Sequence, residues 1–330
     1  MRKALIVGID YYEYGDDLSG CVADALAVKG VLERNADGGL NFPSPRVLIA
    51  PRAEQPVTRR QLKDAVEALF EDDSDIALFY FAGHGSVDST GGFLCASDTE
   101  DADAGLSLND VMSFANRSKA KNKIIILDSC HGGIAGGSSR DPNVGELQEG
   151  VTIMTASTKD QYSMEVPGGG SGVFTNLLVD ALSGSAANLV GSITPGSVYA
   201  HIDQSLGPWE QRPVFKTNVK TFVSLKEAKP PIALEHLRSL TTHFPTPDYK
   251  FPLDPTYEPF RSNDDLANPD IPDPDENNTA TFAVLQKLVH VNLVRPVDEE
   301  HMWYAAMGSK ACELTALGQH YWNLVARDRI

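Results

Sequence analysis

The chain has 330 residues, of which 42% are hydrophobic, and it carries a formal net charge of −17 with a pI near 4.8. This composition supplies enough apolar side chains for one large domain or two of ordinary size. The acidic balance and the lack of any run of Lys and Arg argue against a nucleic-acid partner, because phosphate contacts need clustered basic side chains. An acidic surface suits a basic substrate or ligand, and it is also typical of soluble proteins in general.

The cysteines Cys21, Cys95, Cys130 and Cys312 are widely separated and form no CxxC pair. Their spacing predicts neither a disulfide framework nor a metal site of the zinc type. The apolar run near the start is too short for a signal sequence or a membrane span, and no other stretch reaches about 18 apolar residues. We therefore expect a cytoplasmic protein with no membrane partner, in a reducing compartment where a cysteine stays a thiol.

Short β-branched runs alternate with helical patterns over the first two thirds of the chain, as they do in βαβ units. The predicted strands are Ala4–Ile9, Arg46–Ala50, Ile76–Ala82, Lys123–Asp128, Val151–Ala156 and Pro213–Thr217. The predicted helices are Ala23–Leu32, Thr58–Glu71, Ser107–Arg117, Val173–Leu182 and Gly196–Leu206. Thr58 and Gln61 form a capping box at the start of the second helix. The fold class predicted is α/β, a three-layer αβα sandwich with a six-stranded, mostly parallel sheet and helices on both faces.

The composition changes after this region. Residues 1–228 form one predicted domain, 229–279 a Pro-rich linker or wrapping segment, and 280–330 a small C-terminal α+β subdomain. In the last, predicted helices Ala280–Val291 and Leu314–Val325 flank a predicted strand at Met302–Ala306. This order resembles the end of a winged-helix unit, but the segment is acidic. The composition favours the alternative, a small interaction or capping subdomain. A regulatory protein is a candidate partner for this region.

Two predicted strands end in residues that can carry chemistry. Ile76–Ala82 runs into His84 and Gly85, and Lys123–Asp128 runs into Cys130. Ligands of open α/β sheets bind beyond the carboxyl ends of the strands, so we expect the thiol and the imidazole at one edge of the sheet. A thiol attacks a carbonyl poorly unless a neighbouring base raises its thiolate fraction, which His84 can do. The N–H groups of Gly85 and Cys130 can then form an oxyanion hole.

Each of these residues has a simpler interpretation when it is taken alone. A cysteine after a buried strand is commonly an inert apolar residue, and a histidine between glycines is commonly a turn residue. The placement of both at neighbouring strand ends favours catalysis.

The motif FYFAGHG, followed some forty residues later by IIILDSCHGG, resembles the caspase and metacaspase family of cysteine peptidases. The resemblance covers roughly residues 1–220 and includes VGIDYY, GCVADA at Gly20–Ala25 and SGVFTNLL at Ser171–Leu178. It implies the caspase-hemoglobinase fold, a cysteine endopeptidase that needs no cofactor, and a dyad of Cys130 and His84 with Gly85 at the oxyanion hole. It also implies that His131 faces away from the dyad.

The resemblance bears on substrate preference as well. Asp128 stands two residues before Cys130, where aspartate-cleaving caspases resemble one another in carrying a glutamine, and Asp24 matches a second pocket acid of metacaspases. Two carboxylates in one recess attract an Arg or Lys side chain and repel an Asp. The alternatives are a strand-end hydrogen bond for Asp128 and a helix first-turn charge for Asp24. Ser157 matches the pocket wall, and the predicted partner is a peptide or protein cleaved after Arg or Lys.

Two loops suggest that the enzyme is regulated. The resemblance to the family implies a role in cell-death or defence signalling. Gly136–Gly150 is polar and contains Arg140, which would suit self-cleavage, and the alternative is an uncut loop. The acidic run Asp98–Asp103 can bind calcium by analogy with some metacaspases, but it lacks the EF-hand spacing, which favours a solvated loop. The rival functions are a separase-like or gingipain-like peptidase, against which GCVADA counts, and a catalytically silent scaffold, against which the intact dyad counts.

Overall fold

The computed structural model describes residues 1–101, 104–129, 147–156, 172–206, 212–263, 265 and 268–330. The chain forms two compact units. The first comprises Met1–Ala187 with Gly191–Lys229, and the second comprises Pro230–Ile330 with Asn188–Val190. Among the described residues, no helix combines the length and the hydropathy that a membrane span requires.

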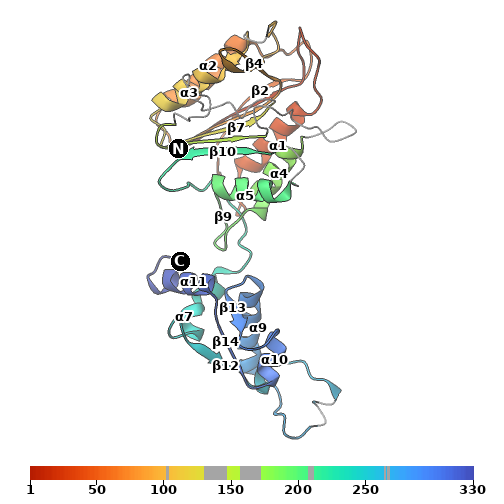
Figure 1. Ribbon diagram of the computed structural model, residues 1–330, viewed down its shortest axis with the longest axis vertical. Helices are drawn as coiled ribbons and strands as arrows, with labels where there is room; N and C mark the ends of the chain where they lie inside the picture. Colours follow the sequence, from red (N-terminus) through yellow and green to blue (C-terminus); the bar gives the residue numbers. More distant parts are fainter. Residues whose placement is uncertain (102–103, 130–146, 157–171, 207–211, 264, 266–267) are drawn as a thin grey trace. The chain divides into compact units, whose positions relative to one another are not determined.

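A six-stranded sheet forms the centre of the first unit (Figure 1). Its strand order is β10-β8-β7-β3-β1-β2, and all neighbouring strands are parallel except β10, which runs antiparallel to β8. The strands are β1 (Arg2–Ile9), β2 (Arg46–Ala50), β3 (Ile76–Ala82), β7 (Asn122–Asp128), β8 (Val151–Thr155) and β10 (Val214–Asn218). The prediction of a mostly parallel, six-stranded sheet is confirmed.

Successive side chains of each strand enter two different cores, because they point to opposite faces of the sheet. In β3, Phe79 and Phe81 enter one core, and Leu78 and Tyr80 enter the other. Helices α2 (Arg59–Glu71) and α3 (Leu108–Arg117) cover the first core, and α1 (Cys21–Glu33), α4 (Val173–Asp180) and α5 (Pro195–Ser205) cover the second (Figure 1). The predicted three-layer sandwich is therefore confirmed.

The start of α2 follows the predicted capping box. The Thr58 side chain accepts from the Gln61 N–H at 3.3 Å, and the Gln61 side chain accepts from the Thr58 N–H at 2.9 Å. These bonds satisfy N–H groups that have no acceptor within the first turn of a helix. After α4, the chain continues into a π-helical turn, η2 (Ala181–Ser185).

Several short elements of the first unit were not predicted. A small antiparallel sheet contains β4 (Gly85–Asp88), β5 (Gly91–Leu94) and β6 (Leu106–Ser107), and a two-stranded sheet pairs β9 (Ser192–Ile193) with β11 (Lys226–Glu227). Segments of two to four residues are too short to show a periodic pattern in the sequence. The first small sheet begins directly after His84, one of the candidate catalytic residues.

The second unit is an α+β structure around a three-stranded antiparallel sheet of order β12-β14-β13. Its strands are β12 (Lys250–Pro252), β13 (Val294–Pro296) and β14 (Ala311–Leu314). The helical segments with described bounds are α6 (Leu234–Arg238), α7 (Leu240–His243), η3 (Pro255–Tyr257), α9 (Glu276–His290), α10 (Met302–Met307) and α11 (Ala316–Ala326). The sheet and α9 share one buried core.

The second unit differs from the sequence-based expectation in two places. The prediction of a strand at Met302–Ala306 is wrong, because α10 occupies this segment; its buried residues Met302, Ala305 and Ala306 have the spacing of one helix face. The stretch 229–279 also contains α6, α7 and β12, and its Leu237 and Phe244 are buried in the core of this unit. Much of this stretch is thus folded, although its many prolines and polar residues favour an extended segment.

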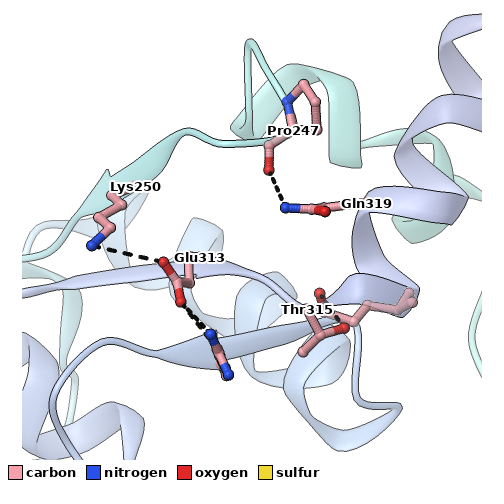
Figure 2. Close-up of polar contacts among 7 residues, drawn as sticks. Pro247, Lys250, Glu313, Thr315 and Gln319 are labelled. Atoms are coloured by element: carbon pink, nitrogen blue, oxygen red, sulfur yellow. Dashed lines mark hydrogen bonds and ion pairs between the residues drawn. The ribbon is translucent and has the colours of Figure 1, made fainter.

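Polar contacts of β14 hold the small sheet together. Glu313 on β14 accepts two hydrogen bonds from the Arg295 guanidinium, at 3.0 and 2.7 Å. Its carboxylate also lies 3.9 Å from the Lys250 ammonium. Figure 2 draws the contact between Glu313 and Lys250 as a dashed line. Thr315 begins α11 by accepting from the Gly318 N–H at 3.0 Å. One carboxylate therefore joins all three strands of this sheet.

Candidate active site

The carboxyl ends of β3 and β7 bring the candidate residues to one edge of the large sheet. Ala82 and Asp128 are partners in the parallel register, and the Gly83 N–H donates to the Asp128 carbonyl at 3.3 Å. His84 is the next residue along the chain after Gly83. Cys130 and His131, which follow β7 in the sequence, lie outside the described residues.

The loop after β1 contacts His84 at its backbone and at its ring. The His84 N–H donates to the Tyr12 hydroxyl oxygen at 2.7 Å, and His84 Nε2 lies 2.9 Å from the Asp16 carbonyl oxygen. The two aromatic rings have centroids 4.6 Å apart at an angle of 54°. Because a carbonyl oxygen only accepts hydrogen bonds, Nε2 must carry the hydrogen, and Nδ1 is the atom of the neutral ring that can accept a proton.

The backbone N–H of Gly85 points away from its neighbouring strand. In an antiparallel pair, residues that exchange hydrogen bonds alternate with residues that do not. The Cys95 N–H donates to the His84 carbonyl at 3.0 Å, and Gly85 stands opposite Leu94 at the next position along the ladder. Gly85 therefore occupies a position without a ladder bond, where its N–H faces outward from β5.

Two buried carboxylates converge on Gly172. Asp24 and Asp128 are only 3% and 8% exposed. Asp24 Oδ2 accepts from the Gly172 N–H at 2.9 Å. A Cβ atom placed on Gly172 would lie 3.0 Å from Asp128 Oδ2 and 3.4 Å from Asp24 Oδ2. Asp24 on α1 and Asp128 at the end of β7 thus border the same small space.

Thr175 and Tyr80 extend this arrangement on the α4 side of the sheet. The Thr175 hydroxyl donates to Asp128 Oδ2 at 2.7 Å, and Thr175 Oγ1 lies 2.6 Å from the Tyr80 hydroxyl. Because the single hydrogen of the Thr175 hydroxyl goes to the carboxylate, Tyr80 donates to Thr175. Burial, followed by the negative charges of Asp128 and Asp24, raises the pKa of Tyr80 well above 10.0. Tyr80 therefore remains a neutral donor.

A family comparison decides the type of domain. The caspase domain, the peptidase C14 family, matches residues 1–223. The chain belongs to the caspase-domain family. Membership gives this chain a domain of the cysteine-peptidase type.

The structure of caspase-1 from Spodoptera frugiperda is similar to the caspase domain described here. It has a TM-score of 0.50 and 15% sequence identity, and the match covers 69% of this chain and 91% of that one. At this identity the similarity shows the fold alone. No curated protein matches the chain.

Of the remaining predicted residues of the caspase domain, the structure describes some and leaves others outside the described ranges. Ser157 and Arg140 lie outside the described residues. Asp98, at the start of the acidic run, accepts from the Arg59 N–H at 2.7 Å and so supports the first turn of α2. The part of the chain that the structure describes contains no group of three or more side chains arranged to hold a metal ion. Calcium activation stays a prediction.

Sequence reasoning missed the residues that surround His84 and the two acids. Tyr12, Asp16, Gly172 and Thr175 received no role, although three of them lie in motifs that carry the resemblance to caspases, VGIDYY and SGVFTNLL. The signal was present as a motif. Its physical meaning depends on contacts between residues 72 and 148 positions apart, which no local pattern indicates.

Proposed function

We propose that this chain is a cysteine endopeptidase that cleaves protein substrates after Arg or Lys. The observation that carries the proposal is the convergence of Asp24 and Asp128 on Gly172. Charge-assisted hydrogen bonds to carboxylates are strong, and a planar guanidinium can donate to two acceptors at once. An acidic substrate side chain would meet two like charges in the same recess, so Asp would be excluded.

The reaction in this proposal begins at the thiol of Cys130. Nδ1 of His84 takes the thiol proton, and the thiolate attacks the carbonyl carbon of the scissile bond. The C–N bond then breaks, and His84 gives the proton to the leaving amine. Water, deprotonated by His84, hydrolyses the thioester and releases the thiol again. The hydrogen bond from Nε2 to the Asp16 carbonyl supports this assignment, because it reserves Nδ1 for the proton transfers.

The oxyanion formed by the attack needs donors that are already in place. We assign this role to the N–H groups of Gly85 and Cys130. The outward-facing N–H of Gly85 supports the assignment, since it lies one residue after His84 and makes no ladder bond to β5. A donor that is fixed before the reaction costs no reorganisation when the charge develops.

A reporter panel tests the function. The purified full chain is incubated with Arg, Lys and Asp reporter peptides, with and without calcium, beside the Cys130→Ala variant. We expect cleavage of the Arg or Lys reporters, none of the Asp reporter, and loss of activity in the variant. Preference for Asp would contradict the acidic pocket, and full activity of Cys130→Ala would contradict the dyad.

Regulation belongs to the same proposal. We expect self-cleavage after Arg140, a signalling role of the kind that the family suggests for cell death or defence, and a regulatory partner at the second unit. Mass spectrometry of the incubated chain tests the first of these. A fragment that ends at Arg140 should appear with the wild type and be absent with Cys130→Ala and with Arg140→Gln.

A further inference from the structure

The buried hydroxyl of Tyr12 occupies the position that a backbone carbonyl would have in a continued β-ladder. The Cys95 N–H donates to the His84 carbonyl at 3.0 Å, which is half of a hydrogen-bonded antiparallel pair. The other half would be a bond from the His84 N–H back to Cys95. The His84 N–H instead donates to the Tyr12 hydroxyl at 2.7 Å. Tyr12 thereby ends the ladder and directs the backbone of His84 towards the loop after β1.

Burial of Tyr12 keeps its hydroxyl neutral, and the hydrogen bond to the His84 N–H therefore does not depend on ionisation of the tyrosine. Tyr12 is 5% exposed, and its burial raises the pKa of its hydroxyl well above 10.0, so the hydroxyl stays neutral. A partly buried backbone N–H that loses its acceptor is destabilised, so the bond to Tyr12 holds the His84 backbone in this orientation.

Gly83 makes room for the hydroxyl. A Cβ atom placed on Gly83 would lie 2.6 Å from the Tyr12 hydroxyl oxygen, which is closer than atoms can approach. The residue before His84 must therefore lack a side chain if the hydroxyl is to reach the His84 N–H. The absence of a side chain at Gly83 is thus required by the hydroxyl of Tyr12, which is far away in the sequence.

The backbone of the same residue is also connected to the contact at the imidazole ring. The Tyr12 N–H donates to Asp17 Oδ1 at 2.9 Å, which closes a short turn containing Asp16. The carbonyl of Asp16 lies 2.9 Å from His84 Nε2. Asp17 therefore fixes the turn that presents the Asp16 carbonyl to the ring, and residue 12 takes part in both contacts, through its hydroxyl in one and through its backbone N–H in the other.

We propose that Tyr12 is a positioning residue for His84, which it holds through its hydroxyl and, together with Asp17, through the Asp16 carbonyl. The inference rests on the proposed function, because positioning matters only if His84 acts as a base. It concerns the proton transfers at Nδ1 and not the binding of substrate.

The experiment compares kcat and KM for the Arg reporter in four variants of the full chain. Tyr12→Phe removes the hydroxyl and keeps the ring, and we expect kcat to fall about tenfold with KM unchanged within about twofold. Asp17→Ala should lower kcat severalfold, and Asp17→Asn should restore it because an amide oxygen accepts the same bond. Tyr321→Phe, which removes the hydroxyl of another buried tyrosine in the second unit, is the control and should leave both constants unchanged.

Alkylation of Cys130 by iodoacetamide gives a readout that needs no substrate. The rate should fall in Tyr12→Phe by about the same factor as kcat, because both depend on the position of His84. Wild-type constants in Tyr12→Phe, or equal losses in Asp17→Ala and Asp17→Asn, would overturn the inference while leaving the peptidase intact. If the wild type cleaves no reporter and alkylates no faster than His84→Ala, the proposed function itself fails.

Discussion

The hydroxyl of Thr175 donates to the carboxylate of Asp128 at 2.7 Å and accepts from Tyr80 at 2.6 Å. Tyr80 and Asp128 come from adjacent strands, and Thr175 comes from α4. The chain of two hydrogen bonds fixes one oxygen of Asp128 beside Gly172. Orientation of a carboxylate in this way is needed if its charge is to be presented to a substrate side chain in a fixed direction.

Thr175→Val should therefore weaken recognition of basic substrates. Valine has the shape of threonine but gives Asp128 no donor and Tyr80 no acceptor, so the carboxylate loses one of the bonds that orient it. We expect KM for the Arg reporter to rise about tenfold with a smaller change in kcat, and the free energy of unfolding to fall by about 1–2 kcal/mol. Steady-state kinetics and urea unfolding measure the two effects.

Thr175→Ser is the matched control, because serine keeps the hydroxyl and loses only a methyl group. Its KM should stay close to that of the wild type. A rise of equal size in both variants would mean that packing, and not the hydrogen bond to Asp128, is what α4 contributes.

Gly172→Ala should narrow the space between the two acids. The backbone of Gly172 has φ −61° and ψ 145°, which alanine adopts without strain. The added methyl would approach Asp128 Oδ2 to 3.0 Å, so the loss would come from occupied space and desolvation of the carboxylates. We expect kcat/KM for the Arg reporter to fall about tenfold or more, measured beside the Lys reporter.

Gly30→Ala on α1 is the control for this substitution. A Cβ atom at Gly30 meets no atom within 4 Å, and alanine is the better helix former. Kinetics should be unchanged, and the free energy of unfolding should rise by about 0.5–1 kcal/mol. If Gly172→Ala behaves like Gly30→Ala, the space at Gly172 is not part of the substrate pocket.

The sequence predicts the large sheet well because its strands are continuous apolar runs. A run such as IALFYFA, with all seven residues buried, is typical of a parallel strand covered on both faces. The end of this run also puts His84 just after the strand, where the structure has it. In the second unit, the strands have only three or four residues, and α10 has only six, of which Trp303 and Tyr304 favour a strand, so local patterns fail there.

The site is predictable only in part for a related reason. His84 follows directly from the strand that carries it, and the acidity of Asp24 and Asp128 is visible in the sequence. The hydroxyl of Tyr12 and the backbone of Gly172 act through hydrogen bonds that exist only after the sheet and its helices have assembled. Neither a tyrosine in a loop nor a glycine before a helix has a composition signal that separates this role from an ordinary structural one.

Cys312 provides a test of the second unit by pH. It lies on β14, the central strand of the small sheet, and is fully buried; this burial raises the pKa of its thiol from 9.0 to about 12. In the unfolded chain the thiol ionises near its ordinary value, so the unfolded state gains stability from about pH 9 upwards while the folded state does not. The contribution of the neutral Cys312 thiol to the free energy of unfolding is fully present below pH 9. It is lost progressively as the pH rises towards about 12.

Urea unfolding of the full chain between pH 8 and pH 11, followed by tryptophan fluorescence, measures this loss. Trp322 reports on the second unit, because its indole N–H donates to the Phe244 carbonyl at 2.6 Å. The free energy of unfolding of this unit should fall by an amount on the order of a few kcal/mol in the wild type, and less steeply in Cys312→Ala, which lacks the thiol. The rate of alkylation of Cys312 should lead to the same conclusion, because a buried neutral thiol reacts only after the protein unfolds. Equal pH dependence of the two proteins, or fast alkylation of Cys312 in the native protein at pH 8, would show that β14 is open to solvent.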